Sequence, residues 1–179
     1  MKTICLLRHA KSGEHDAGLR DFDRSLNARG RRAARLMGEW MAGEGLTFDH
    51  AVVSPAKRTK ETLAEVEAGF GGSFGAVDEQ RIYLASSVTL LELVREIDDA
   101  HQNLLLLGHN PGLEDLVLDL VPDDGSSPLR DSLYMKFPTC SVALLETQAE
   151  HWSDVGEGAV RLTRFVRPRD LDPELGPED

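Results

Sequence analysis

Short continuous runs of apolar residues alternate along the chain with longer segments in which apolar residues recur at helical spacing. Such short runs are typical of strands that are buried on both faces of a sheet. They predict strands at residues 2–7, 48–53, 81–84, 104–107, 141–145 and 160–166. The helical spacing predicts helices at about residues 28–41, 55–68, 88–97 and 111–120. Because strands alternate with helices, we expect an α/β protein, a three-layer α/β/α sandwich with a mostly parallel central sheet.

Capping residues and breakers set the expected ends of these elements. Asn27 is a suitable N-cap for the first helix, and Ser54 with Pro55 suits the start of the second. Polar or glycine-rich stretches predict loops at residues 10–26, 69–75 and 121–130. The end of the chain, from residue 167, is rich in proline and acidic residues, and we expect it to be disordered.

Composition narrows the class of protein. The 179 residues suit one domain, and the 41% of apolar residues suffice for a core. The net charge of −11 argues against binding to nucleic acid or to an anionic membrane, both of which require a basic surface. We expect no secretory signal and no transmembrane segment, because no apolar run approaches about 20 residues. Cys5 and Cys140 are expected to be free, buried thiols of a cytoplasmic protein.

Basic and imidazole side chains follow three of the predicted strands. Arg8 and His9 come directly after the first apolar run, and His109 follows the run at residues 104–107. Arg58 stands near the start of the helix that follows the second strand. Because ligands of α/β proteins bind beyond the carboxyl ends of the parallel strands, we expect these four side chains to meet in one crevice.

This combination of residues suits a phosphoryl group. Two guanidinium groups can bind phosphate oxygens in bidentate fashion, and helix N-termini offer free N–H groups to an anion. A neutral imidazole held in one tautomer is a competent nucleophile towards phosphorus. A second imidazole, if protonated, would stabilise charge on the equatorial oxygens.

Other kinds of phosphatase fit the sequence less well. Asp21 and Asp23 would suit a metal-dependent aspartyl phosphatase only if they directly followed a buried strand, whereas a polar segment precedes them. A cysteine phosphatase needs an arginine six positions after its cysteine, where this chain has Lys11 and Glu146. The remaining histidines show no metal-ligand spacing, and we expect no metal site; they are His15, His50, His101 and His151.

Three motifs together resemble a known family. They are Arg8-His9-Ala10-Lys11-Ser12, Ser54-Pro55-x-x-Arg58-Thr59-x-x-Thr62 and Gly108-His109-Asn110-Pro111. They are similar to those of the histidine phosphatase superfamily, and more narrowly to the SixA-type phosphohistidine phosphatases. The segment Asp21-x-Asp23-Arg24-x-Leu26-Asn27-x-x-Gly30 and the terminal Arg167-Pro168-Arg169-Asp170-Leu171 extend the resemblance over nearly the whole chain.

The resemblance implies one histidine phosphatase domain over residues 1–171, followed by a disordered acidic tail at residues 172–179. It implies that His9 accepts the phosphoryl group, while Arg8, Arg58 and His109 form the phosphate pocket. Ser12 and Asp21 are further candidates for substrate binding. No cofactor or metal is expected, and the oligomeric state is left open. The expected partner is a phosphohistidine-bearing protein or a small phosphorylated molecule. The alternatives are a phosphatase of small phosphate esters and a phosphate-binding module without turnover.

A general acid is not obvious from the sequence. Larger members of the family carry one on a segment inserted between the second arginine and the second histidine. Here Arg58 and His109 are only 51 positions apart, and predicted helices and a strand occupy that interval. An imidazole leaving group, with a pKa of about 6.5, needs such an acid less than an alkoxide does. Asp21, Glu79 and Tyr83 are the candidate donors.

Overall fold

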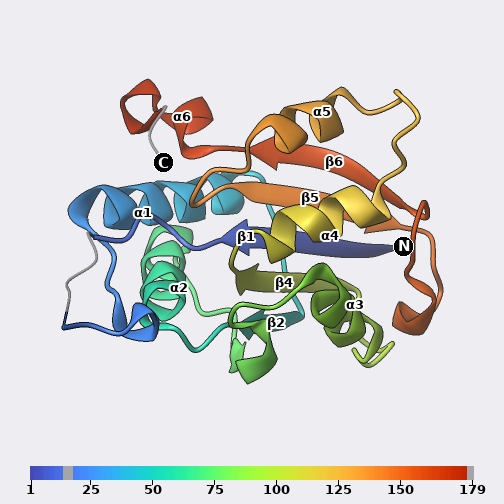
Figure 1. Cartoon of the computed structure of the whole chain (residues 1–179), viewed down its shortest axis with the longest axis horizontal. Coiled ribbons are helices and arrows are strands. Elements are labelled where there is room, and N and C mark those ends of the chain that lie inside the picture. The colour runs from blue at the N-terminus through green and yellow to red at the C-terminus, as the bar shows by residue number, and fades with distance from the viewer. Residues whose placement is uncertain (14–17, 177–179) are drawn as a thin grey trace.

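A six-stranded sheet in the order β3-β2-β4-β1-β5-β6 forms the middle layer of the molecule (Figure 1). The computed structural model describes residues 1–13 and 18–176. Its strands are β1 (Lys2–Arg8), β2 (His50–Val53), β3 (Val77–Asp78), β4 (Asn103–Gly108), β5 (Val142–Thr147) and β6 (Val160–Val166). The pairings among β1, β2, β3 and β4 are parallel, and β5 is antiparallel to both of its neighbours. The sheet is therefore mostly parallel.

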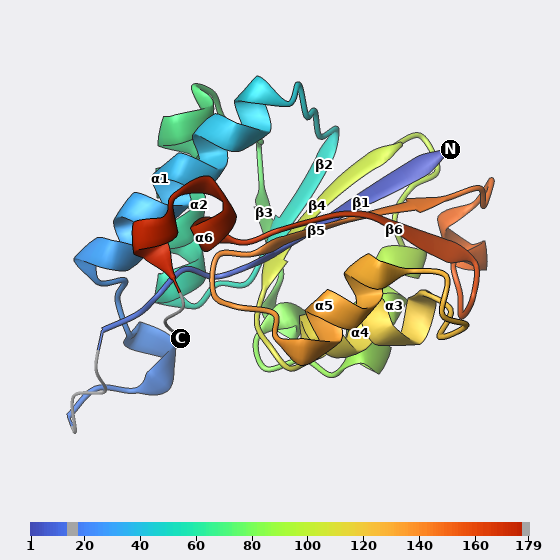
Figure 2. The ribbon, with the colours of Figure 1, turned by 90° about the horizontal axis from the view of Figure 1, so that it is seen from above.

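Helices cover both faces of this sheet (Figure 2). One face carries α1 (Ala28–Gly43), α2 (Lys57–Phe70) and the short α6 (Pro168–Leu171), and the other carries α3 (Ser87–Arg95), α4 (Gly112–Leu120) and α5 (Pro128–Met135). Four 3-10 turns complete the described elements: η1 (Asp21–Asp23), η2 (Gln80–Ile82), η3 (Trp152–Asp154) and η4 (Pro173–Leu175). The predicted three-layer α/β/α architecture is confirmed.

Alternate residues of the central strands belong to two separate hydrophobic cores, one on each face of the sheet. Ile4 and Leu6 of β1 pack in the core under α3, α4 and α5, whereas Cys5 and Leu7 pack in the core under α1 and α2. Successive side chains of a strand point to opposite faces, so a continuous apolar run is what a strand covered on both sides requires. Cys140 also lies in the second core, and both cysteines are buried, free thiols as expected.

Glycines allow α1 to approach its neighbours closely. A Cβ at Gly38 would lie 2.0 Å from the carbonyl oxygen of Val66 in α2, and one at Gly30 would lie 2.1 Å from the carbonyl oxygen of Lys11. Any larger residue would separate these segments. The two contacts fix α2 and the segment after β1 against the same helix. Both of those segments carry candidate site residues, Arg58 on α2 and His9 at the end of β1.

The structure corrects several predicted boundaries. Residues 81–84 are not a strand, because Ile82 is buried as part of the turn η2, and the strand lies instead at Val77–Asp78. Residues 121–130 are not all loop, since Pro128 begins α5 with Ser127 as its N-cap. A short apolar run does not distinguish a strand from a turn, and a proline can begin a helix as well as end one. The predicted cap at Asn27 is confirmed by its side chain, which accepts a hydrogen bond from the Gly30 N–H.

The expected disorder after residue 167 does not hold for the residues that the structure describes. Pro168–Leu171 is helical, Pro173–Leu175 forms η4, and Leu175 is buried in the core beside α1. Leu171 packs against the same core, so two leucines hold this segment on the protein despite its polar composition. Residues 177–179 lie outside the described part of the chain. Within that part, no helix has the length and apolar character needed to cross a membrane.

Candidate active site

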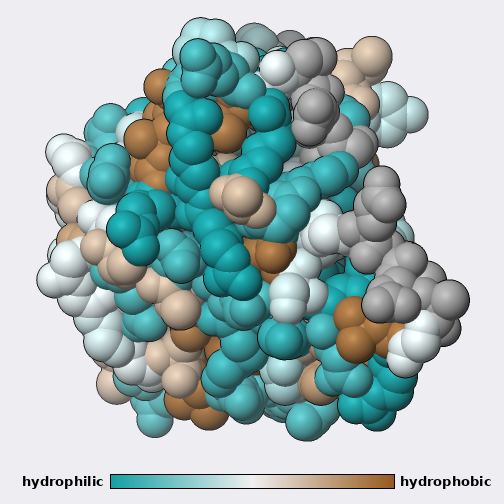
Figure 3. All heavy atoms as spheres, turned by 90° about the vertical axis from the view of Figure 1, so that its left-hand side faces the viewer, coloured by the Kyte–Doolittle hydropathy of each residue, from teal (hydrophilic) through white to brown (hydrophobic). Residues whose placement is uncertain are grey.

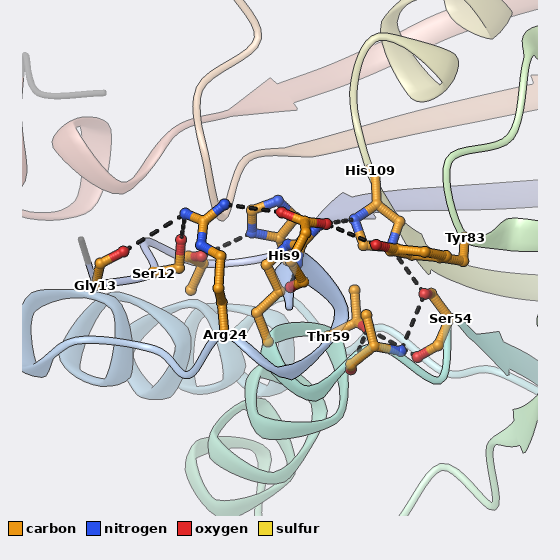
Figure 4. Close-up of polar contacts among 12 residues, drawn as sticks. His9, Ser12, Gly13, Arg24, Ser54, Thr59, Tyr83 and His109 are labelled. Atoms are coloured by element: carbon orange, nitrogen blue, oxygen red, sulfur yellow. Dashed lines mark hydrogen bonds and ion pairs between the residues drawn. The ribbon is translucent and has the colours of Figure 1, made fainter. Parts of the chain in front are cut away.

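The two histidines of the predicted crevice lie side by side at the carboxyl edge of the sheet. β1 and β4 are adjacent and parallel, with Arg8 paired to Gly108, so that His9 and His109 both follow directly. Their ring centroids are 5.3 Å apart (Figure 4). Only 9% of His9 and 5% of His109 are exposed. The side chains that follow these two adjacent parallel strands therefore lie in one crevice, as predicted.

His9 is held in a single tautomer. Its Nδ1 lies 2.8 Å from the carbonyl oxygen of Ala10, and a carbonyl oxygen can only accept a hydrogen bond. Nδ1 therefore carries the proton, and Nε2 keeps its lone pair. Burial, together with the positive charges nearby, outweighs the Ala10 hydrogen bond and lowers the pKa of His9 to about 3. The ring is thus neutral at pH 7, as a nitrogen nucleophile must be.

Arg8 reaches the crevice from the last residue of β1. Its Nη1 donates to the carbonyl oxygen of Phe137 at 2.9 Å, and the side-chain amide of Asn110 donates to the same oxygen at 3.0 Å. The guanidinium is thereby tied to the segment that precedes β5 and to the residue after His109. This arrangement explains why Asn110 belongs to the second histidine motif.

Arg58 lies in the first turn of α2, and only 5% of it is exposed. The two threonines of its motif hold that turn in place. Thr59 Oγ1 donates to the carbonyl oxygen of Ser54 at 2.8 Å, and Thr62 Oγ1 accepts the N–H of Ala10 at 2.9 Å. The second contact links α2 directly to the residue after His9. Thr59 thus holds the turn that carries Arg58, and Thr62 holds the residue that follows His9.

Ser54 does not cap α2, which is the role that the sequence predicted for it. The helix begins at Lys57 with Ala56 at its N-cap position and without a side-chain cap. The Ser54 hydroxyl instead lies 2.8 Å from Nε2 of His109. On the other side of that ring, Arg58 Nη2 is 3.4 Å from Nδ1. Since arginine only donates, Nδ1 of His109 accepts and Nε2 donates to Ser54.

His109 is neutral in this arrangement. Burial first, and then the charge of Arg58, lower its pKa to about 4, while Asp21 opposes the shift. The protonated form that would stabilise phosphoryl oxygens is therefore not the resting form of the site. A bound phosphate anion would favour the charged imidazole, because an opposite charge nearby raises the pKa of a histidine.

Asp21 collects three hydrogen bonds at the mouth of the crevice. Its carboxylate accepts from Tyr83 Oη at 2.7 Å, from Arg24 Nη1 at 3.0 Å and from Arg58 Nη2 at 3.0 Å. Partial burial raises its pKa, but these bonds and the charge of Arg58 outweigh burial and lower it to about 2. Asp21 is therefore ionised at neutral pH and orients Arg58. Asp21 thus contacts Arg58 directly, and its part in substrate binding stays a prediction.

The remaining predicted residues lie less directly at the crevice. Ser12 accepts a hydrogen bond from Arg24, which in turn binds Asp21, so Ser12 joins the site through Arg24. Glu79 is bound to the guanidinium of Arg81 at 2.6 Å. Sequence reasoning missed Arg24 and Ser54, although both stand in the motifs that carried the resemblance.

A further carboxyl group that sequence reasoning missed lies in the first turn of α4. The pKa of Glu114 is raised by burial and by the charge of Asp115, whereas the charge of Arg8 lowers it. Its backbone N–H donates to the side chain of Asn110 at 3.2 Å. Among the candidate proton donors, Asp21 is ionised, and the Tyr83 hydroxyl has a raised pKa, first through burial and then through its bond to Asp21.

Residues 1–13 and 18–176 contain no cluster of three His, Cys, Asp or Glu side chains that could hold a metal ion. His15 lies outside these residues. His50 and His101 stack on each other, and His151 contacts Asp99, all three at the opposite end of the sheet from His9. Catalysis without a metal stays a prediction, which a chelator can test.

Comparison with known proteins agrees with this geometry. The family described as histidine phosphatase superfamily (branch 1) matches residues 4–81. An uncharacterized protein of Mycobacterium tuberculosis is 35% identical over 164 residues, which are 91% of this chain and 100% of that protein. The structure of a SixA protein of Agrobacterium tumefaciens, assigned as a phosphohistidine phosphatase, is 30% identical with a TM-score of 0.79 and covers 93% of this chain and 98% of its own.

A second SixA structure, from Nakamurella multipartitia and with the same assignment, is 29% identical with a TM-score of 0.81. It covers 93% of this chain and 96% of its own length. Both structures thus cover most of this chain and nearly all of their own length. With its two histidine motifs and its arginines gathered at one edge of the sheet, the chain belongs to the histidine phosphatase superfamily and to its SixA-type group.

Proposed function

We propose that this phosphatase removes the phosphoryl group from phosphohistidine in a protein, by way of a phosphohistidine formed on His9. Membership of the family supports phosphatase chemistry that proceeds through a histidine. The observation that carries the assignment to His9 is the hydrogen bond between its Nδ1 and Ala10, which leaves the Nε2 lone pair free beside Arg8, Arg58 and His109.

The reaction has two balanced steps. In the first, Nε2 of His9 attacks phosphorus, a P–N bond forms on His9, and the P–N bond of the substrate breaks. The departing imidazole takes up a proton from solvent. In the second step, water attacks the phosphorus, the bond to His9 breaks, and inorganic phosphate and a proton are released. Arg8 and Arg58 neutralise the oxygens in both steps, and His109 contributes once the phosphate has raised its pKa.

The leaving group argues for phosphohistidine over an alkyl ester. Residues 58–109, all of which the structure describes, form the rest of α2, then β3, η2, α3 and β4, with no inserted segment that carries an acid. Asp21 is ionised and Glu79 is bound to Arg81, so neither is placed to protonate a leaving oxygen. The imidazole ring of phosphohistidine, with a pKa of about 6.5, can be protonated by solvent before the P–N bond breaks. An alkyl ester would have to expel a strongly basic alkoxide unless a positioned acid protonates the leaving oxygen.

Glu114 supports a second candidate, a phosphatase of small phosphate esters. The raised pKa of Glu114 increases the protonated fraction of this carboxyl. Glu114 also lies near Arg8, because the charge of Arg8 acts on the same carboxyl. A protonated carboxyl there would serve an alkoxide leaving group. The variant Glu114→Gln separates the two candidates, because it removes the acid without a change of shape. It lowers ester hydrolysis under the second candidate and leaves phosphohistidine hydrolysis unchanged under the first.

The direct test compares substrates. Phosphohistidine peptides and phosphoramidate are expected to have a higher kcat/KM than glycerol 3-phosphate or sugar phosphates. Rates are measured below KM near neutral pH and corrected for spontaneous P–N hydrolysis. A higher kcat/KM for the alkyl phosphates would place the small-ester candidate first. Binding of phosphate without turnover of any substrate would instead indicate a phosphate-binding module.

Trapping the intermediate tests the nucleophile. Rapid quenching with labelled substrate is expected to yield protein label that is labile in acid and stable in alkali, as a phosphoramidate is. The label should be absent from His9→Ala. Acid-stable label would instead point to a hydroxyl nucleophile. A chelator is expected to leave the rate unchanged, and a loss restored by magnesium would revive the aspartyl mechanism.

A further inference from the structure

A hollow lined by cations lies beside the catalytic crevice. Its walls come from the segment after β1, the start of α1, the segment between α5 and β5, and α6 with η4. The hollow has a volume of about 40 Å³, which suits a compact ionic group. Among the eleven described residues that line it, five are basic and none is acidic; the five are Lys11, Arg29, Lys136, Arg167 and Arg169.

Two chain segments link the walls of the hollow to the phosphate pocket. Lys11 is two residues after His9, a separation of at most about 7 Å between Cα atoms. On the opposite wall, Pro138 and Thr139 directly follow Phe137, whose carbonyl oxygen accepts the hydrogen bond from Arg8. The next residue, Cys140, donates its N–H to the carbonyl oxygen of His9 at 3.0 Å.

The charge of the hollow contrasts with that of the chain. The whole chain carries a net charge of −11, and yet five of its 20 lysines and arginines line this hollow. Arg167 is bound to Asp170 at 2.8 Å, and its charge is largely compensated. Lys11 is half-buried, and neither it nor Arg169 forms an ion pair with a carboxylate of the described residues. Figure 3 views the molecule from the side at which β1 and β4 end, and much of that surface is hydrophilic.

We propose that this hollow binds a second anionic group, a carboxylate or a phosphate, of the same molecule whose phosphoryl group is transferred to His9. The inference rests on the proposed function, because it assumes that a substrate occupies the adjacent crevice. The binding group is then an acidic side chain near the phosphohistidine of a protein, or the second acidic group of a small phosphate ester. In an otherwise acidic protein, such a local basic site selects substrates by where their negative charges lie.

Two pairs of probes distinguish these sources. The first pair is a phosphohistidine peptide flanked by glutamates and the same peptide flanked by glutamines. The second pair is 3-phosphoglycerate, which carries a carboxylate, and glycerol 3-phosphate, which does not. Phosphoramidate, with no second group, measures the basal activity. The wild-type protein is expected to favour the glutamate peptide about tenfold in kcat/KM, and less so at high ionic strength, where charges are screened.

The double variant Lys11→Gln/Arg169→Gln tests whether the hollow causes this preference. It is expected to abolish the preference for glutamate while its rate with phosphoramidate stays within about twofold of wild type. The matched control is Arg35→Gln/Arg161→Gln, which removes two exposed cations elsewhere, one on α1 facing Glu65 and one on β6 facing Glu146. If the control also abolishes the preference, general electrostatics is responsible, and the inference is overturned.

Failure of the hollow and failure of the proposed function give different results. If both peptides are hydrolysed equally and 3-phosphoglycerate is not preferred, the hollow does not bind a second anionic group. The proposed function then still stands. A preference for 3-phosphoglycerate that depends on Lys11 and Arg169, without hydrolysis of either peptide, supports the hollow and overturns the protein substrate. If only phosphate esters are hydrolysed and 3-phosphoglycerate is not preferred among them, both the hollow and the proposed function are overturned.

Discussion

His9 and His109 follow β1 and β4 at the carboxyl edge of the sheet, whereas His50 and His101 lie at the amino edge of β2 and β4. The two pairs have similar spacing, with centroids 5.3 Å apart in the first and 4.7 Å apart in the second. Their orientation differs, since the first pair is tilted by 54° and the second is stacked at 17°. The second pair acts as a natural control for the first.

The charges around the two pairs differ more than their geometry does. Arg8 and Arg58 add to burial in lowering the pKa of His109, and α2 and α4 begin nearby. At the amino edge, burial and His101 lower the pKa of His50, but Asp49 raises it. The hollow next to that pair is lined by the acidic residues Glu79, Glu96 and Asp98 and by Arg81, which is bound to Glu79 and Glu96. An anion is therefore attracted to one edge and repelled from the other, which shows that two neighbouring imidazoles do not by themselves make a phosphate site.

The largest expected effect comes from removing the proposed nucleophile. His9→Ala should lower kcat by at least about 10⁴-fold, because no other group would form the covalent intermediate. His50→Ala, the matched change at the amino edge, should leave kcat unchanged. Turnover is measured with phosphoramidate, and thermal unfolding verifies that both variants fold. Near-normal activity of His9→Ala would refute the assignment and remove the functional difference between the edges.

The arginines provide the next comparison. Arg58→Ala is expected to lower kcat/KM on the order of 10²-fold, through the loss of positioned charge on the phosphoryl oxygens. Arg8→Ala should have a similar effect. Arg81→Ala, which removes an exposed arginine bound to Glu79 and Glu96, should change kcat/KM by less than about twofold. Equal losses for Arg58→Ala and Arg81→Ala would mean that net charge, and not the position of the guanidinium, governs the rate.

Asp21 is expected to have a smaller and indirect effect. Asp21→Asn keeps the backbone carbonyl that accepts from Arg58 Nη1 at 2.8 Å but removes the carboxylate charge that accepts from Nη2. A loss of about tenfold in kcat/KM is expected from a less fixed guanidinium. Asp49→Asn is the control at the amino edge, where the carboxylate caps the N–H groups of Gln102 and Asn103. If Asp21 were instead the proton donor, its replacement would remove the acidic group from the pH profile of kcat.

The smallest effect concerns stability against pH. The pKa of His9 is about 3 and that of His109 about 4, both below the ordinary value of 6.5. Between these values the unfolded chain binds more protons than the folded one, so the free energy of unfolding falls as the pH falls. The loss from pH 7 to pH 5 is on the order of 1 kcal/mol per histidine. Urea unfolding at the two pH values measures it.

The variant His9→Gln/His109→Gln should weaken this pH dependence, since it removes both shifted groups. His151→Gln serves as a control of opposite sign, because the hydrogen bond that His151 donates to Asp99 raises the pKa of His151. Its contribution to stability is present below the ordinary pKa and is lost as the pH rises. An unchanged slope in the double variant would show that other groups cause the acid sensitivity.

Much of the crevice followed from local sequence. The apolar runs before His9 and His109 predicted two buried strands, and the topology of parallel sheets then brought their carboxyl ends together. Arg58 followed in the same way from the strand and helix around it. Residues 81–84 and 128–130 were assigned incorrectly. A short apolar run can form a strand or a turn, and a proline can begin or end a helix, so packing decides between the alternatives.

The sequence by itself determined which residues stand at the ends of strands, because that depends on periodicity over a few positions. Only the tertiary structure decided their chemical states. The tautomer of His9 depends on where the Ala10 carbonyl points. The lowered pKa of Asp21 depends first on the hydrogen bond from Tyr83, 62 positions away, and then on Arg24 and Arg58. The basic hollow joins residues from Lys11 to Gly176. Such contacts are set by how helices pack on the sheet, and a local pattern of apolar and polar residues does not encode which distant charges will meet.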